Sequence, residues 1–340
     1  MSRTPDPAGL WDRFAGCRYD AASPEGHYES YFLRANHPTA SSAFWIRYTL
    51  FSPKGRPEAA LGELWAIAWD AETGRTTAVK TERPLSECAF GKRLLSVLVG
   101  AARLDEREAS GEASSRGHRI GWELSFPGGE PPLLLIPSRM YDGGFPKAKM
   151  MVLAPNARFT GAITVDGVRM PVDDWVGSVN HNWGRAHTDE YAWGQVAGFD
   201  GAPGTFLEVG TGRIRLGGRL YTPRSTPLVL RMDDGETIAV NTLFQSVRTR
   251  ANYTFFDWSF DARARGVSVR GRVSAPRAAF VGLTYPNPPG GAKTCLNSKI
   301  ARCELTVERA GRPSRTLISE RRAAFEILTD RADHGVELSV

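Results

Sequence analysis

The sequence predicts an all-β protein made of two antiparallel β-barrel or β-sandwich domains in tandem. Short apolar segments recur along the whole chain, and turn residues separate them at regular intervals. The chain holds 35 glycines and 22 prolines, which is typical of many short strands and turns. Its 340 residues also exceed the usual size of a single domain.

Changes in this pattern predict the domain boundaries. Residues 1–25 contain three prolines and no clean periodicity, so we expect an N-terminal arm that packs late or stays loose. Residues 26–172 are expected to form the first β domain and residues 173–340 the second. A Trp, Ala, aromatic, Asp order occurs at both 65–70 and 193–200, which is a faint sign that the halves are related.

The first predicted domain opens with a hairpin and meander. An aromatic and β-branched run at 44–51 stops at Ser-Pro-Lys-Gly, and a second run at 61–69 stops at a turn rich in Asp, Thr and Gly. Further strands are expected at 94–104, 120–126, 133–136, 150–153 and 162–165. The first of these suits a short helix as well.

The second predicted domain repeats this texture of short apolar runs and turns. Strands are expected at 191–199, 205–209, 214–221, 227–231, 237–240, 251–260, 267–273, 299–307 and 324–328. No phosphate-binding loop, dinucleotide-binding motif or nucleophile elbow interrupts them. The spacing therefore favours barrels or sandwiches over alternating strands and helices.

Charge and cysteine content exclude several classes of protein. The net charge is +6, but the arginines are interleaved with acidic residues, which argues against a nucleic-acid partner. Residues 1–20 lack an apolar signal region and no run approaches the 18 residues of a membrane span, so we expect a cytoplasmic protein without stable membrane insertion. The four cysteines show no CxxC spacing and are expected to be reduced.

The segment 172–185 carries the strongest chemical signal, because it gathers two Trp, a His, two Asn and an Arg. If it runs extended, His181 and Trp183 point to one face, and Asn180 and Asn182 point to the other. An acid-base group beside an indole suits a pocket for an apolar substrate. The alternative is a core histidine bonded to a carbonyl beside a Trp that fills a barrel.

These residues resemble the hydroxyneurosporene synthase and AttH-like group, with the bacterial carotenoid 1,2-hydratases, and more distantly tocopherol cyclase and lipocalin-like Diels-Alderases. The resemblance rests on His181-x-Trp183-Gly184, on Trp193-Gly194 and on the order of strands and turns. It implies two lipocalin-like β domains around an apolar cavity and no cofactor. The implied activities are proton-driven hydration, cyclisation or isomerisation of a polyene, terpenoid or polyketide.

In the hydratases of this group, the His-x-Trp element is followed by Tyr-x-Asp, which supplies the acid. The nearest counterpart here is Phe206-Leu207-Glu208, in which Glu208 keeps a carboxyl group and Phe206 lacks the phenol. An apolar cavity would keep Glu208 protonated by penalising its charged form. The alternative is an outward-facing strand residue. Asp189 is a further candidate acid, unless it lies in a solvated loop.

Other residues are expected to form the substrate-binding wall. They are Trp183, Trp193, Asn182, Phe206, Tyr191, Trp65 and Glu63. Aromatic faces also stabilise cationic intermediates. No spacing among His181, His187, Asp189 and Glu190 matches a metal-ligand pattern, so no metal is expected.

The sequence thus predicts a cofactor-independent hydratase, cyclase or isomerase whose partner is a hydrophobic small molecule. A non-catalytic carrier of such a molecule, a pericyclase that acts by folding its substrate, and a protein with a merely packed core remain as alternatives. Arg270 and Arg272 would share one strand face, where they would form a solvated surface or make transient contact with membrane headgroups.

Overall fold

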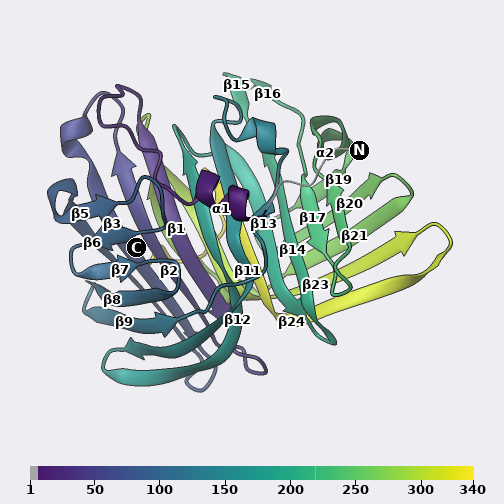
Figure 1. The fold of residues 1–340 in the computed structure, drawn as a ribbon, viewed down its shortest axis with the longest axis horizontal. Coiled ribbons are helices and arrows are strands. Elements are labelled where there is room, and N and C mark those ends of the chain that lie inside the picture. Colours follow the sequence, from purple (N-terminus) through teal and green to yellow (C-terminus); the bar gives the residue numbers. More distant parts are fainter. Residues whose placement is uncertain (1–6, 219) are drawn as a thin grey trace.

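The computed structural model describes residues 7–218 and 220–340, and it consists almost entirely of antiparallel strands in two large curled sheets (Figure 1). The first sheet contains β1 His27–Asn36, β2 Ala43–Ser52, β3 Leu61–Asp70, β4 Arg75–Pro84, β5 Cys88–Phe90, β6 Val97–Val99, β7 Ala102–Leu104, β8 Glu108–Ser115, β9 His118–Ser125, β10 Leu133–Leu134, β11 Ala148–Val165 and β12 Val168–Gly184. The all-β prediction is therefore confirmed.

The second sheet follows in the chain. It contains β13 Glu190–Phe199, β14 Ala202–Arg213, β17 Leu228–Arg231, β18 Thr237–Val240, β19 Arg250–Tyr253, β20 Asp257–Ala264, β21 Val267–Ser274, β22 Val281–Pro286, β23 Ala292–Arg309 and β24 Arg312–Thr329. A small separate ribbon pairs β15 Arg215–Gly217 with β16 Leu220–Tyr221. The helices are α1 Pro7–Phe14 and α2 Leu243–Arg248, with short 3-10 turns at Pro57–Ala59, Leu85–Glu87, Ser138–Met140 and Arg277–Ala279.

The two sheets share one topology. The first runs β4-β3-β2-β1-β12-β11-β9 and onward, and the second runs β18-β17-β14-β13-β24-β23-β21 and onward. In each sheet the last strand in the sequence pairs with the first one. The last strand also forms a long hairpin with the strand before it. The halves are therefore related, but β13 corresponds to β1, so the similar segments 65–70 in β3 and 193–200 in β13 are not equivalent.

The passage from one sheet to the other lies later than the expected boundary at residue 173. β12 runs unbroken through this position and pairs with both β1 and β11. The chain leaves the first sheet after Gly184 and enters the second at Glu190. Residues 173–184 therefore belong to the first sheet.

Each sheet curls around its own apolar core. In β2, Phe44, Ile46 and Tyr48 face the first core, whereas Ala43 and Trp45 face the second sheet. Both faces of the central strands are thus buried, one inside a barrel and one between the domains. This burial explains why β1, β2 and the part of β12 from Trp175 onward are nearly continuous runs of buried residues without the polar alternation of a half-exposed strand.

The N-terminal arm is ordered where the structure describes it, which corrects the expectation of a loose segment. Leu10, Phe14 and Ala15 are buried in the first core. Phe14 packs against Tyr141 and Trp183, with ring centroids 5.2 and 6.3 Å away. The helix α1 therefore covers the core of the first domain; residues 1–6 lie outside the described part. Within the described residues, no helix is long and apolar enough to cross a membrane.

Candidate active site

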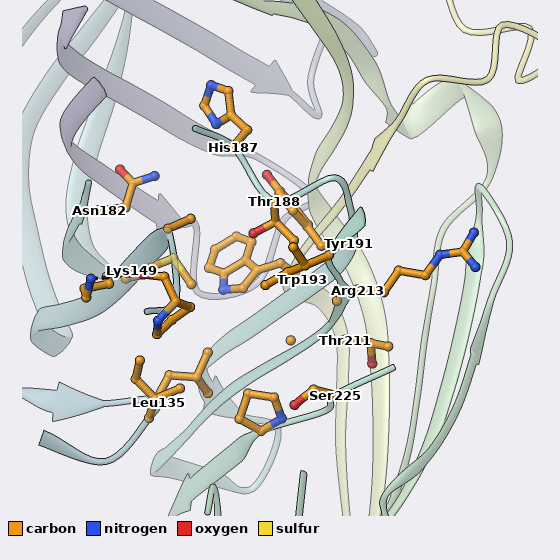
Figure 2. A pocket seen from close by; sticks show the side chains of 18 of the residues that line it. Leu135, Lys149, Asn182, His187, Thr188, Tyr191, Trp193, Thr211, Arg213 and Ser225 are labelled. Carbon is orange, nitrogen blue, oxygen red and sulfur yellow. Dashed lines mark hydrogen bonds between the residues drawn. The ribbon is translucent and has the colours of Figure 1, made fainter. Parts of the chain in front are cut away.

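A cavity of about 520 Å³ lies between the two domains, and both sheets contribute to its walls. Strands β1, β2, β11 and β12 line it from the first domain, and β13, β14, β22 and β24 line it from the second. Figure 2 shows Asn182, Lys149 and Leu135 on one side of this space, with Trp193 and Tyr191 beside them toward its centre. A cavity of this size suits a small organic ligand.

Aromatic rings form much of the wall. Phe32 and Trp45 come from the first sheet, and Trp193 and Tyr285 come from the second. The rings of Phe32 and Trp193 meet edge to face, with their centroids 6.0 Å apart. These rings hold the two domains together and offer an apolar surface to a ligand.

Glu326 on β24 is the one carboxylate among the described residues that line the cavity. It is 7% exposed. Its Oε1 accepts hydrogen bonds from Asn297 Nδ2 at 3.0 Å and Lys299 Nζ at 2.7 Å. Its Oε2 accepts only longer contacts, from the Tyr191 hydroxyl at 3.4 Å and the Cys295 thiol at 3.7 Å. One oxygen is thus firmly held and the other is weakly bonded.

Lys299 places a positive charge behind the aromatic wall. It is fully buried, and its Nζ lies 5.4 Å from the Trp193 ring centroid and 5.6 Å from that of Trp45. Burial lowers the pKa of Lys299, while the carboxylate of Glu326 opposes this shift. The ion pair with Glu326 therefore compensates both buried charges.

Glu208 lies one step behind the cavity wall. Its carboxyl group accepts hydrogen bonds from Trp193 Nε1 at 2.7 Å and from Gln195 Nε2 at 2.8 Å. It is 1% exposed, and burial raises its pKa to about 8, although both hydrogen bonds act in the opposite direction. Glu208 therefore holds the Trp193 indole from behind, mostly as the neutral acid at pH 7.

A buried polar network continues from Glu208 across the domain interface. Gln195 donates to Asn180 Oδ1 at 2.8 Å, and its own Oε1 accepts from Arg34 Nε at 2.8 Å and from Ser178 Oγ at 2.6 Å. Burial lowers the pKa of Arg34 to about 9, which still leaves it charged at neutral pH. Directional bonds of this kind fix how one sheet lies on the other.

Three polar groups on the first sheet line the cavity without a bonding partner among the described residues. Arg47 is 5% exposed, and its Nε has no acceptor. Asn182 Oδ1 is buried and unpaired. The Tyr28 ring packs on His187, with centroids 4.2 Å apart. Its hydroxyl bonds to no described residue.

His187 also lines the cavity, but as a neutral ring. Its Nε2 lies 3.1 Å from the carbonyl of Pro286, and so it donates to that oxygen when neutral. Burial, assisted by the charge of Arg47, lowers its pKa to about 3. The imidazole is therefore a poor proton acceptor at neutral pH.

His181 and Trp183 point away from the cavity, into the core of the first domain. The predicted alternation is confirmed: both lie on one face of β12, and Asn182 lies on the other. The cavity, however, lies on the Asn182 face. His181 Nε2 lies 2.8 Å from Glu29 Oε1 and its Nδ1 lies 2.7 Å from the Phe14 carbonyl, so this side chain connects the N-terminal arm to β1.

The other predicted site residues divide between the wall and its surroundings. Tyr191, Trp193 and Asn182 line the cavity, whereas Glu208, Asp189, Phe206, Trp65, Glu63, His181 and Trp183 do not. Phe206 lies in a small apolar cluster between the domains. The indole of Trp65 donates to Glu63 at 3.0 Å and stands edge-on behind Tyr285.

Asp189 is an ion-pair partner outside the cavity wall. Burial raises its pKa, but bonds from Lys147 Nζ at 2.8 Å and Arg215 N at 2.9 Å outweigh this and lower it. It is therefore ionised at neutral pH, unlike the acid that alkene protonation requires. Within the described residues, no three His, Cys, Asp or Glu side chains gather as metal ligands.

Sequence reasoning missed Arg47 and Glu326 as site residues. Each is a charged residue inside an otherwise buried strand, in Trp-Ile-Arg-Tyr and Ala-Phe-Glu-Ile respectively. A charge at such a position needs a partner or a function. That signal was available without the structure.

The fold and the cavity define the protein as a two-domain, lipocalin-like β protein with a ligand-sized space between its domains. The chain is similar in structure to a protein described as AttH from Nitrosomonas europaea (TM-score 0.52, covering 90% of this chain and 92% of that one). It is also similar to kievitone hydratase from Nectria haematococca (TM-score 0.55, 90% and 89%) and to CghA (TM-score 0.52, 93% and 89%), each at 12% identity. The predicted resemblance to AttH-like proteins is thus confirmed at the level of the fold.

Comparison by sequence adds less information about the class of protein. No family model matches the chain. The uncharacterized protein Rv0493c of Mycobacterium tuberculosis is 27% identical over 292 residues, which span 84% of this chain and 82% of that protein.

Proposed function

We propose that the protein is a cofactor-independent lyase or isomerase, of the hydratase or cyclase kind, that acts on a lipophilic small molecule in the interdomain cavity. The observation that carries this proposal is Glu326, a carboxylate in the wall of an apolar, aromatic space, one of whose oxygens is weakly bonded. The structural similarity to kievitone hydratase supports the same kind of chemistry.

Glu326 and Tyr191 provide a base and a hydrogen-bond donor. Lys299 and Asn297 fix Oε1 of Glu326, which leaves Oε2 to take a proton from a substrate carbon. Burial keeps the pKa of Tyr191 well above its usual value, so its hydroxyl stays protonated and donates to a substrate oxygen. A proton returned to another carbon completes an isomerisation or cyclisation. Loss of a hydroxide, protonated as it leaves, completes a dehydration, whose reverse is hydration.

The charges around the cavity favour an anionic over a cationic intermediate. Lys299 lies behind the faces of Trp45 and Trp193, and Arg47 lines the space without a bound carboxylate. These positive charges stabilise a developing enolate and disfavour a carbocation. The aromatic wall therefore serves to hold an apolar substrate, such as a polyene, terpenoid or polyketide.

Turnover by a Glu326→Gln variant tests the proposal. Wild type and variant are incubated with a lipophilic extract of the producing organism in D₂O, and products are followed by mass spectrometry. Loss of the base is expected to lower product formation by about 10²–10⁴-fold, and the wild-type product is expected to contain carbon-bound deuterium. Glu72→Gln, on an exposed turn, is the matched control.

Two outcomes would contradict the proposed chemistry. A ligand that both proteins retain unchanged would identify a carrier. Equal turnover by wild type and Glu326→Gln, without deuterium in the product, would identify a pericyclase that works by folding its substrate.

A further inference from the structure

Arg47 is a buried cation that faces the cavity. It is 5% exposed, its Nε has no acceptor, and no described carboxylate lies within ion-pair distance of it. Its guanidinium packs on the ring of Tyr285, with the central carbon 4.7 Å from the centroid. Burial lowers the pKa of Arg47, but Tyr285, Glu63, Tyr191 and Glu326 outweigh this and raise it, so the guanidinium stays charged and can pair with a bound anion.

The other charged groups on the wall already have partners. Glu326 pairs with Lys299, and Arg213 pairs with Glu190 at 2.6 Å. Lys149 Nζ donates to the carbonyls of Gly143 and Pro146. Arg47 and Lys149 are therefore the cations of the wall that form no ion pair with a described carboxylate, although Glu63 and Glu326 act on Arg47 from a greater distance.

Two further groups line the same cavity as Arg47, and the Tyr28 hydroxyl and the Asn182 Nδ2 can donate hydrogen bonds to the same ligand. Tyr28 is close enough that the charge of Arg47 opposes the rise that burial causes in its pKa. Asn182 lines the cavity from the neighbouring strand β12, on the same face of the sheet as Tyr28. A guanidinium, an amide and a hydroxyl together match a planar head with two oxygens.

We infer that the ligand of this cavity is a lipophilic anion whose carboxylate, or equally planar acidic enolate, binds Arg47, Asn182 and Tyr28 while its apolar body lies along the aromatic wall. This inference rests on the proposed function, because it names the substrate class of the same cavity. It concerns binding, however, and so it is measured without turnover.

The test compares two fluorescent probes that differ only in charge, cis-parinaric acid and its methyl ester. Wild type is expected to bind the acid more tightly than the ester. Arg47→Gln is expected to lose about 30-fold or more in affinity for the acid and to keep its affinity for the ester. Arg103→Gln, an exposed arginine on β7, is the matched control, and ester binding reports that each variant is folded.

Three outcomes of the binding test overturn the inference. Equal wild-type affinity for acid and ester would show that the cavity does not select a charge, even if Arg47→Gln failed to fold. Failure of wild type to bind either probe would show that the cavity does not take lipophilic anions. A preference for the acid that persists in Arg47→Gln would place the anion elsewhere. If binding of the acid depends fully on Arg47 but Glu326→Gln shows normal turnover, the proposed chemistry is contradicted and the inference about the anion is not.

Discussion

At the residue scale, the interface between the sheets is a place where titratable side chains are buried and bonded. Glu208 and Glu326 are both carboxyl groups on the interface face of the second sheet, yet their environments differ. Glu326 has a lysine partner, whereas Glu208 is bonded by the neutral groups of Trp193 and Gln195. Burial without a paired cation raises the pKa of Glu208 to about 8.

This shift predicts a stability that falls with rising pH. The Glu208 carboxyl has an ordinary pKa of 4.5 and a folded value of about 8, so between these values the folded state binds more protons than the unfolded state. The free energy of unfolding therefore declines as pH rises through this window and levels off above it. Glu208→Gln carries no charge and lacks this decline.

We expect Glu208→Gln and wild type to be similarly stable near pH 5, and the variant to be more stable at about pH 9 by several kcal/mol. Urea unfolding at both pH values measures the difference. A constant difference between the two proteins would mean that Glu208 titrates normally in the folded state.

Residue alternation was predictable, but the face that lines the cavity was not. The period of two placed His181 and Trp183 together, as the structure has them. Which side of β12 meets the second domain depends on how β13 packs against it, and the residues of β12 do not specify that contact. Since both faces are buried, hydrophobicity did not distinguish them.

At the element scale, α1 and the chain after it are joined to the first sheet through Glu29. Its carboxylate accepts from the backbone nitrogens of Arg18 and Tyr19 and bonds to His181 and His27. Burial raises the pKa of Glu29, but the two histidines outweigh this and hold it well below its usual range. The arm is thereby fixed over the first core.

Removal of His181 is therefore expected to affect stability more than ligand binding. His181→Ala leaves Glu29 without its buried histidine partner and leaves the Phe14 carbonyl unbonded, at a cost of about 3–5 kcal/mol. Urea unfolding measures this loss, and parinarate fluorescence measures binding by the folded variant. Unchanged stability with lost binding would instead return His181 to the ligand site.

Strands were predictable where they carry apolar residues and not where they are polar. β2 and β3 match the expected hairpin closely. β8, with the sequence Glu-Ala-Ser-Gly-Glu-Ala-Ser-Ser, lies in a stretch that shows no strand signal, and pairing with β9 rather than its own composition makes it a strand.

At the scale of the whole molecule, the two domains share an interior. Apolar residues of both domains form common clusters, and Arg34 bonds to Gln195 and to the Arg322 carbonyl across the interface. Separation of the two domains would expose these buried charges and apolar residues to water at the same time. The expected domain boundary missed this arrangement, because β12 belongs to the first sheet and also packs on β13.

We therefore expect thermal unfolding in one cooperative transition. Calorimetry, tryptophan fluorescence and far-ultraviolet circular dichroism should give coincident midpoints. Two resolved transitions, one for each sheet, would show that the interface contributes little to stability.

Because the cavity lies outside both barrels, one set of residues packs the cores and another set surrounds the cavity. In a single barrel, the same interior must provide both the packed core and the space. A protein that binds its ligand inside a barrel gives up packed core to make room for it. Here each sheet has its own apolar core, and the cavity is bounded by side chains on the opposite faces of the sheets, such as Asn182 and Trp193. Selection for a new substrate can therefore rebuild the space by small changes in the docking of two intact halves, with folding left undisturbed.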